Sequence, residues 1–170
     1  METLNKKERF TDIYNKEVDA VFRYCRSRVN DRDKAVEITQ DVFTELCVKY
    51  SKDEAVEHER AFLFTLAHNK IVDWYRRKKS LSLDEMMNDD GEHFFEPADE
   101  KAGTDIVLGA EAGRIIEAIN ALDPSYREAV YLRFVEDLPP QEIAKILGTT
   151  ASITSVRITR GLEKLKEKFN

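Results

Sequence analysis

The chain has 170 residues, of which 42% are hydrophobic and 35% charged, and it contains only six glycines and four prolines. This composition excludes collagen-like and low-complexity proteins and leaves enough apolar residues for one small core or two. No apolar run approaches the roughly 18 residues that span a bilayer, and residues 1–10 lack the apolar stretch of a secretory signal, so we expect no membrane insertion. Two cysteines, Cys25 and Cys47, cannot form a disulfide framework, which favours a reducing, cytoplasmic setting.

The net charge of −6 is concentrated in one segment. Residues 80–107 carry nine acidic residues and one basic residue, whereas residues 1–79 have a net charge of +2 and residues 108–170 a net charge of zero. The two flanking segments can therefore carry local basic surfaces, and the acidic total does not exclude a nucleic-acid partner.

Residues 1–79 place apolar residues at intervals of three and four, which is the period of an amphipathic helix. Three such stripes predict three helices, and Asp33 is positioned to cap the second of them. The polar, aperiodic stretch 51–59 predicts a loop. The stripes are Val18, Val21, Phe22, Cys25 and Val29; Ala35, Ile38, Val42, Leu46 and Tyr50; and Phe62, Leu63, Leu66, Ala67, Ile71 and Trp74.

Residues 80–109 interrupt this pattern. They combine acidic residues with glycine and proline, and they place Met86-Met87 and Phe94-Phe95 in adjacent pairs. Adjacent apolar residues point to different faces of a helix, so we interpret the segment as a flexible acidic linker.

Residues 110–170 return to helical spacing. Asp123-Pro124 and Pro139-Pro140 predict helix starts, and Gly148 predicts a left-handed helix end. We expect the last helix to bury Ile158, Leu162, Leu165 and Phe169. Since the sequence shows no strand-like alternation, the predicted fold class is all-α, with two small helical domains joined by the acidic linker.

Residues 139–165 have the spacing of a helix-turn-helix, in which a short helix, a glycine turn and a longer helix follow one another. The N-terminal part of the longer helix would enter a DNA major groove. An ordinary helical hairpin is the alternative, but the E-I-A-x-x-L-G pattern followed by two arginines favours DNA binding. The candidate DNA-binding residues are Gln141, Ser152, Thr154, Ser155, Arg157 and Arg160.

A second candidate site is the end of the third predicted helix, where Trp74 and Tyr75 precede four basic residues, Arg76–Lys79. Aromatic rings stack on unpaired bases while cations contact phosphates, so this composition suits single-stranded nucleic acid. Asn69 and Asp73 lie one turn apart and can hydrogen-bond base edges. Taken alone, the segment is better explained as a helix with a buried tryptophan and a solvated basic end.

The second predicted helix has a polar face opposite its apolar stripe. Composition alone leaves two interpretations open: a solvated surface, or a docking surface for a basic partner helix. The residues of this face are Glu37, Gln40, Asp41, Thr44 and Glu45.

No catalytic site, metal site or cofactor is expected. The three histidines lack metal-binding spacing, the two cysteines are 22 positions apart, and neither a Gly-rich phosphate loop nor a nucleophile elbow occurs. We therefore do not expect an enzyme.

The order of these parts, over roughly residues 8–79 and 110–168, resembles the extracytoplasmic-function class of bacterial sigma factors. AVEITQDVFTELCVKY, AFLFTLAHNKIVDWYRRKK and the helix-turn-helix carry the resemblance. It implies a sigma region 2-like domain over residues 1–79, a linker over 80–109 and a sigma region 4-like domain over 110–170. A protein of this class binds core RNA polymerase, recognises and melts the minus-ten element, and contacts upstream duplex DNA without covalent chemistry.

The same resemblance assigns partners and roles. Region 2 docks on the β′ clamp helices, region 4 contacts the minus-thirty-five element and the β flap, and an anti-sigma factor or another recruiting regulator is an expected partner. The expected docking residues are Glu37, Gln40, Asp41, Phe43, Thr44 and Glu45. The expected minus-ten residues are Arg60, Asn69, Lys70, Asp73, Trp74, Arg76, Arg77, Lys78 and Lys79, which would contact the DNA as single strand.

The reading helix departs from the family's usual T-V-K-S-R-[LI]-x-R-[AG]-R. Ser155 stands in place of the lysine and Leu162 in place of the last arginine, so two phosphate-contacting cations are missing. We therefore expect weak minus-thirty-five recognition and help from a recruiting protein. A stand-alone helix-turn-helix regulator is the alternative function, but it would explain residues 139–165 without explaining Asn69–Lys79.

Overall fold

The computed structural model describes residues 2–80 and 109–170, and over these residues it consists of seven α-helices without a strand. The all-α prediction is confirmed. Nearly all of the predicted linker, with Met86-Met87 and Phe94-Phe95, lies outside the described residues. None of the described helices combines the length and the apolar character that crossing a bilayer requires.

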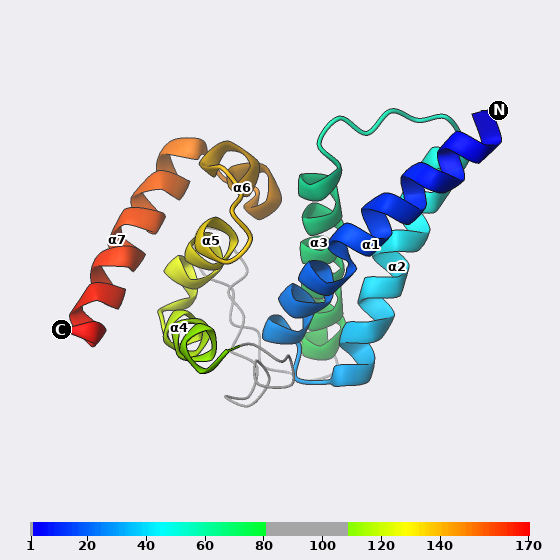
Figure 1. Cartoon of the computed structure of the whole chain (residues 1–170). Coiled ribbons are helices and arrows are strands. Elements are labelled where there is room, and N and C mark those ends of the chain that lie inside the picture. Colours follow the sequence, from blue (N-terminus) through cyan, green and yellow to red (C-terminus); the bar gives the residue numbers. More distant parts are fainter. Residues whose placement is uncertain (1, 81–108) are drawn as a thin grey trace.

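The N-terminal block consists of three mutually packed helices, α1 (Glu2–Arg28), α2 (Arg32–Ser51) and α3 (Glu59–Ser80) (Figure 1). Each helix forms where the apolar spacing predicts it, because each buries its stripe against the other two. The buried residues include Val21 and Cys25 of α1, Val29 directly after α1, Ala35, Ile38, Val42 and Leu46 of α2, and Leu63, Ala67 and Ile71 of α3.

The N-cap of α2 is Asp31 rather than the predicted Asp33. Asp31 has an extended backbone, with φ −96° and ψ 115°, and its carboxylate accepts a hydrogen bond of 3.1 Å from the N–H of Lys34. Asp33 lies within the first helical turn, where its charge faces the positive end of the helix dipole. Two nearby aspartates both match the start signal, and only the backbone geometry shows which of them caps.

The C-terminal block contains α4 (Ala110–Asn120), α5 (Pro124–Phe134), α6 (Pro140–Leu147) and α7 (Ala151–Phe169). Gly148, with φ 67° and ψ 36°, has the left-handed conformation predicted for the end of α6. Thr150 then caps α7, because its Oγ1 accepts a hydrogen bond of 3.2 Å from the N–H of Ile153. Together, α6, the turn and α7 form the predicted helix-turn-helix.

The buried face of α7 differs from the predicted stripe. Phe169 is 62% exposed, and the buried positions of α7 are Thr154, Gly161 and Leu165. Gly161 is required because a Cβ at this position would overlap Val130 Cγ2 of α5. The two helices therefore approach each other more closely than any larger residue would allow.

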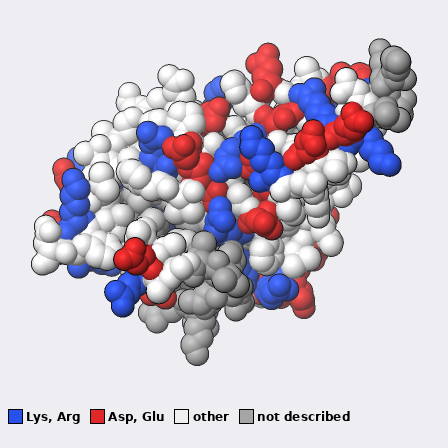
Figure 2. Space-filling view, in the orientation of Figure 1, with Lys and Arg blue, Asp and Glu red and all other residues white. Residues whose placement is uncertain are grey.

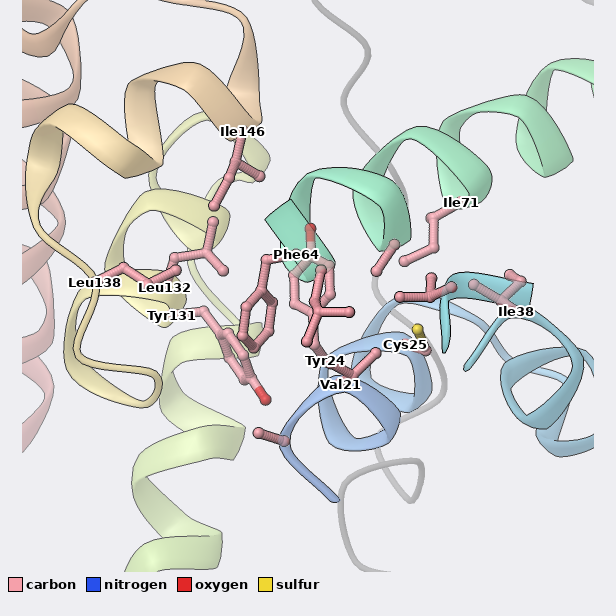
Figure 3. Close-up of a cluster of buried hydrophobic side chains, with 14 of the residues drawn as sticks. Val21, Tyr24, Cys25, Ile38, Phe64, Ile71, Tyr131, Leu132, Leu138 and Ile146 are labelled. Carbon is pink, nitrogen blue, oxygen red and sulfur yellow. The ribbon is translucent and has the colours of Figure 1, made fainter. Parts of the chain in front are cut away.

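The two blocks share one continuous core. The Tyr24 ring of α1 lies 5.5 Å from the Phe64 ring of α3 and 5.9 Å from the Tyr131 ring of α5, between ring centroids (Figure 3). Leu132 and Ile146 extend this cluster within the C-terminal block, and α3 packs against α6. The sequence predicts two domains joined by a linker, whereas the structure also joins them by direct packing.

A polar network accompanies this packing at the block interface. The buried Glu136 carboxylate accepts hydrogen bonds from Arg23, at 3.2 Å, and from Arg60 Nη2, at 2.9 Å. Burial raises the pKa of the Glu136 carboxyl, and the two guanidiniums only partly offset that rise. Glu136 itself is buried, and on the surface seen in Figure 2 acidic and basic side chains lie intermixed along the middle of the molecule.

A second acid, Glu128 of α5, connects the same two blocks. Its Oε1 accepts hydrogen bonds of 3.1 Å from Arg28 Nε and 3.3 Å from the Tyr24 hydroxyl, both on α1. The Tyr24 hydroxyl also lies 3.2 Å from Nδ1 of His68 on α3. Two acids of the C-terminal block are therefore matched to bases of the N-terminal block.

Candidate polymerase and nucleic-acid interfaces

The exposed side of α2 presents five of the six predicted docking residues on one surface. Glu37, Gln40, Asp41, Thr44 and Glu45 are all exposed. Phe43 is the exception, because it is only 3% exposed and its ring packs edge-on against Tyr14, 4.9 Å away. Phe43 therefore supports this surface from behind and does not present its ring to a partner.

The docking surface adjoins the predicted minus-ten residues. Lys70 of α3 lies 2.6 Å from the carboxylate of Glu45 on α2, so the two sets meet at this ion pair. The pair is partly exposed and contributes little to stability, and the packing of α2 on α3 sets the relative position of the two surfaces.

The C-terminal half of α3 brings the aromatic and basic residues together as predicted. Asn69 and Asp73 are exposed, as are the four basic residues Arg76–Lys79. The Trp74 ring is partly exposed, and the Lys78 ammonium lies 4.6 Å from its centroid. This arrangement offers a ring face and cations side by side, which is the combination that holds unpaired bases and their phosphates.

Tyr75 has a structural part in this site. Its ring meets that of Trp74 edge-on at 4.7 Å, and its hydroxyl donates a hydrogen bond to the carbonyl oxygen of Arg28 at the end of α1. Tyr75 thereby fixes the orientation of Trp74 and anchors the end of α3 to α1.

Arg60 lies apart from the other predicted minus-ten residues. It occupies the first turn of α3 and pairs with Glu17. Its guanidinium also donates hydrogen bonds to two acceptors of Glu136, the carbonyl oxygen, at 2.7 Å, and the carboxylate. In this arrangement its guanidinium belongs to the block interface, not to the exposed face of α3 that carries Asn69 and Asp73. Its sequence position beside the 51–59 loop does not reveal this, because both acids that bind it are distant in sequence.

A cleft beside the α2–α3 loop was not predicted. It has a volume of about 340 Å³ and is lined by α1 residues, including Lys6 and Arg9, together with Tyr50 and Asp53. Burial and the neighbouring Glu59 raise the pKa of the Tyr50 hydroxyl to about 12. Periodicity could not reveal the cleft, because the cleft joins segments more than forty residues apart in the sequence.

The helix-turn-helix exposes most, but not all, of its predicted DNA-binding residues. Ser152, Ser155 and Arg160 are exposed on α7, Arg157 is partly exposed, and Gln141 is exposed at the start of α6. Thr154 is fully buried, and its hydroxyl donates a hydrogen bond of 2.9 Å to the carbonyl oxygen of Thr150. Thr154 therefore packs inside the block and cannot reach a base edge in this arrangement.

Over residues 2–80 and 109–170, no group of three or more histidine, cysteine or acidic residues is arranged to hold a metal ion. The surfaces described above are suited to binding.

Comparison with known proteins identifies the family. The model of Sigma-70 region 2 matches residues 13–81, and the model of Sigma-70, region 4 matches residues 112–165. The chain belongs to the sigma-70 family. Among curated relatives, the sigma factor SigW of Bacillus subtilis, of the extracytoplasmic-function class, is 26% identical over 168 residues, covering 96% of this chain and 90% of its own length. SigZ of the same organism is 29% identical over 157 residues, covering 92% and 84%.

Solved structures show the same fold. The sigma factor RpoE from Bartonella quintana, in complex with the anti-sigma factor NepR, matches with a TM-score of 0.68 at 20% identity, over 94% of this chain and 96% of that chain. CnrH, in complex with the cytosolic domain of CnrY, matches with a TM-score of 0.60 at 20% identity, over 96% and 88%. With both regions in the order of its relatives, the protein is an extracytoplasmic-function sigma factor that directs RNA polymerase to promoter DNA.

Proposed function

We propose that this sigma factor divides its work between its two blocks. Residues 1–79 dock on core RNA polymerase and read and open the minus-ten element, residues 80–109 connect the blocks, and residues 110–170 contact upstream duplex DNA. The observation that carries the proposal is the junction of the exposed polar face of α2 with the basic, aromatic end of α3, where Glu45 pairs with Lys70.

The docking step is proposed to use the five exposed polar residues of α2. Three of them, Glu37, Asp41 and Glu45, are acidic, so the surface favours a partner helix with basic side chains, which fits the β′ clamp helices. Charges of this kind raise the association rate and fix the register of docking. All five side chains are exposed while the blocks are packed together, so among the described residues none covers this surface.

The melting step is proposed to use the exposed face of α3. Asn69 and Asp73 are one helical turn apart and offer donors and acceptors for base edges, while Trp74 offers a ring face beside Lys78. Each stacked base contributes about 1–3 kcal/mol, which offsets the cost of unstacking the duplex. Opening is thus driven by preferential binding of the unpaired strand, and it requires no covalent chemistry.

The upstream contact is proposed to be weak, and regulation is proposed to involve a protein partner. Arg157 and Arg160 remain on α7, but Ser155 and Leu162 supply no positive charge for phosphates. RpoE was solved with the anti-sigma factor NepR, and CnrH with the cytosolic domain of CnrY. The complex of RpoE supports a recruiting or anti-sigma regulator for this chain. Because the proposed partners are RNA polymerase and promoter DNA, we propose a cytoplasmic location.

The test is Asn69→Ala in transcription reconstituted with core RNA polymerase. We expect open-complex formation to fall by about tenfold, the scale of one or two lost hydrogen bonds, while affinity for core polymerase stays unchanged. Asn15→Ala, at an exposed position of α1, is the matched control. Unchanged promoter opening by the Asn69 variant would refute the assignment of this helix, and a wild-type chain that does not bind core polymerase would refute the function itself.

A further inference from the structure

The outer side of α7 carries two apolar side chains that the packing of the block does not use. Ile153 and Val156 are 44% and 46% exposed, whereas α7 packs on its neighbours through Thr154, Gly161 and Leu165. β-Branched residues are weaker helix formers than the long polar residues suited to an exposed helix surface. A pair of them three residues apart therefore points to contact with another molecule.

The two side chains line a groove between α7 and the start of α5, with a volume of about 370 Å³. Among the lining residues are two guanidiniums and two serine hydroxyls, but no carboxylate, so the groove suits an anionic partner that also has apolar groups. The lining residues are Ser125, Tyr126, Ser152, Ile153, Val156, Arg157 and Arg160.

Duplex DNA combines these properties. Its backbone is anionic, and the C5-methyl of thymine is an apolar group on a base edge in the major groove, which is wide enough for an α-helix. In a helix-turn-helix the second helix enters this groove with its N-terminal residues, and Ile153 and Val156 lie in the first two turns of α7. A protein partner would have to match each arginine and hydroxyl separately, whereas DNA supplies phosphates and methyl groups together.

We propose that Ile153 and Val156 contact thymine methyl groups, so that the C-terminal block selects neighbouring thymines in the upstream duplex. The proposal rests on the proposed function, because it assumes that α7 lies on promoter DNA. Arg157 and Arg160 hold the phosphates beside them. Because Ser155 and Leu162 supply no cation for further phosphates, the methyl contacts contribute a larger share of the binding affinity, and base contacts alone set the sequence preference.

The first test uses the full chain bound to core RNA polymerase and a promoter library randomised over the upstream duplex. We expect the bound DNA to be enriched in neighbouring thymines, and we expect Ile153→Ala and Val156→Ala to lose that enrichment. Ile115→Ala is the matched control, because Ile115 is 49% exposed on α4 and does not line the groove. Enrichment that survives both α7 substitutions would overturn the proposal.

The second test replaces each enriched thymine with uracil, which removes only the C5-methyl. Affinity of the wild-type holoenzyme should fall about three- to fourfold per position, the effect of exposing one methyl group, and Val156→Ala should be insensitive at the position that Val156 contacts. Wild-type binding that ignores uracil overturns the proposal. Ile153→Ala and Val156→Ala variants that bind DNA normally but lose binding to another protein also overturn the proposal, because that result would show that the groove binds a protein. A wild-type holoenzyme that selects no promoter at all refutes the proposed function and this inference with it.

Discussion

Thr154 and Arg160 lie on the same helix, yet one faces the inside of the block and the other faces solvent. The Thr154 hydroxyl is bonded to the Thr150 carbonyl oxygen and has no exposed surface, whereas Arg160 is exposed beside the α5–α7 groove. The two residues should therefore differ in what their substitution disturbs, although the sequence pattern assigns both to DNA binding.

Thr154→Val is predicted to leave upstream DNA affinity unchanged. The substitution keeps the side-chain shape and removes one hydrogen bond, so the free energy of unfolding should change by no more than about 1.5 kcal/mol. Arg160→Ala, in contrast, should weaken DNA binding and reduce the slope of log affinity against log salt by about 1, because one phosphate contact is lost. Salt titrations of both variants as holoenzyme measure this, and a slope unchanged in Arg160→Ala would contradict the phosphate contact.

At residue scale, sequence spacing identifies a helix and its approximate faces, but it leaves the side-chain direction uncertain by one position. Phe43 shows this, since it is adjacent to the predicted apolar stripe of α2 and yet packs on Tyr14. Arg60 shows a second limit, because its direction is set by acids that the chain brings from far along the sequence. Polar residues with local helical neighbours, such as Asn69 and Asp73, are exposed as predicted.

At the scale of elements, the packing of α7 on α5 depends on Gly161. Gly161→Ala is predicted to lower the free energy of unfolding by about 1–3 kcal/mol, since the new methyl group would overlap Val130 Cγ2. Gly113→Ala in α4 is the matched control. A Cβ at Gly113 meets no described atom within 4 Å, and alanine is the better helix former, so stability should rise by up to about 1 kcal/mol.

Chemical denaturation of both glycine variants, with circular dichroism as the probe, measures these opposite signs. Equal changes in the free energy of unfolding would show that α5 and α7 leave room for a methyl group at position 161. Val130→Ala combined with Gly161→Ala should recover part of the loss, because it removes the atom that is overlapped. Helix starts and ends were predictable from local signals such as Pro124, Pro140 and Gly148, whereas the close approach at Gly161 was not, because it depends on the partner helix.

At the scale of the whole molecule, the two blocks are packed on one core, whereas the promoter elements proposed for them lie far apart along the DNA. The minus-ten and minus-thirty-five elements are separated by about 25 base pairs, or about 85 Å at 3.4 Å per base pair. Blocks that share one core cannot contact both elements together, so they must separate when both are bound. The sequence could not reveal this packing, since Arg23 and Glu136 are 113 positions apart and neither belongs to a periodic pattern.

The hydrogen bonds of Arg23 and Arg60 to the buried Glu136 carboxylate should control whether the two blocks separate. Arg23→Glu is predicted to favour separated blocks, because it removes one partner of the buried Glu136 carboxylate and places a second carboxylate beside it. Burial raises the pKa of the Glu136 carboxyl and Arg23 opposes that rise, so losing Arg23 makes the buried charge less favourable in the packed arrangement. The N-terminal block itself should stay folded, because its apolar core does not include Arg23.

X-ray scattering from the free chain measures the separation. The radius of gyration of Arg23→Glu should exceed that of the wild type, for which a compact chain of this length gives roughly 16 Å before any contribution from extended segments. Lys16→Glu makes the same charge change at an exposed position of α1 and should leave the wild-type value unaltered. A matching rise in affinity for core polymerase would show that the packed arrangement restrains the sigma factor. Identical scattering from both variants would show instead that the shared apolar core, with Tyr24, Phe64 and Tyr131, holds the blocks together without the ion pairs.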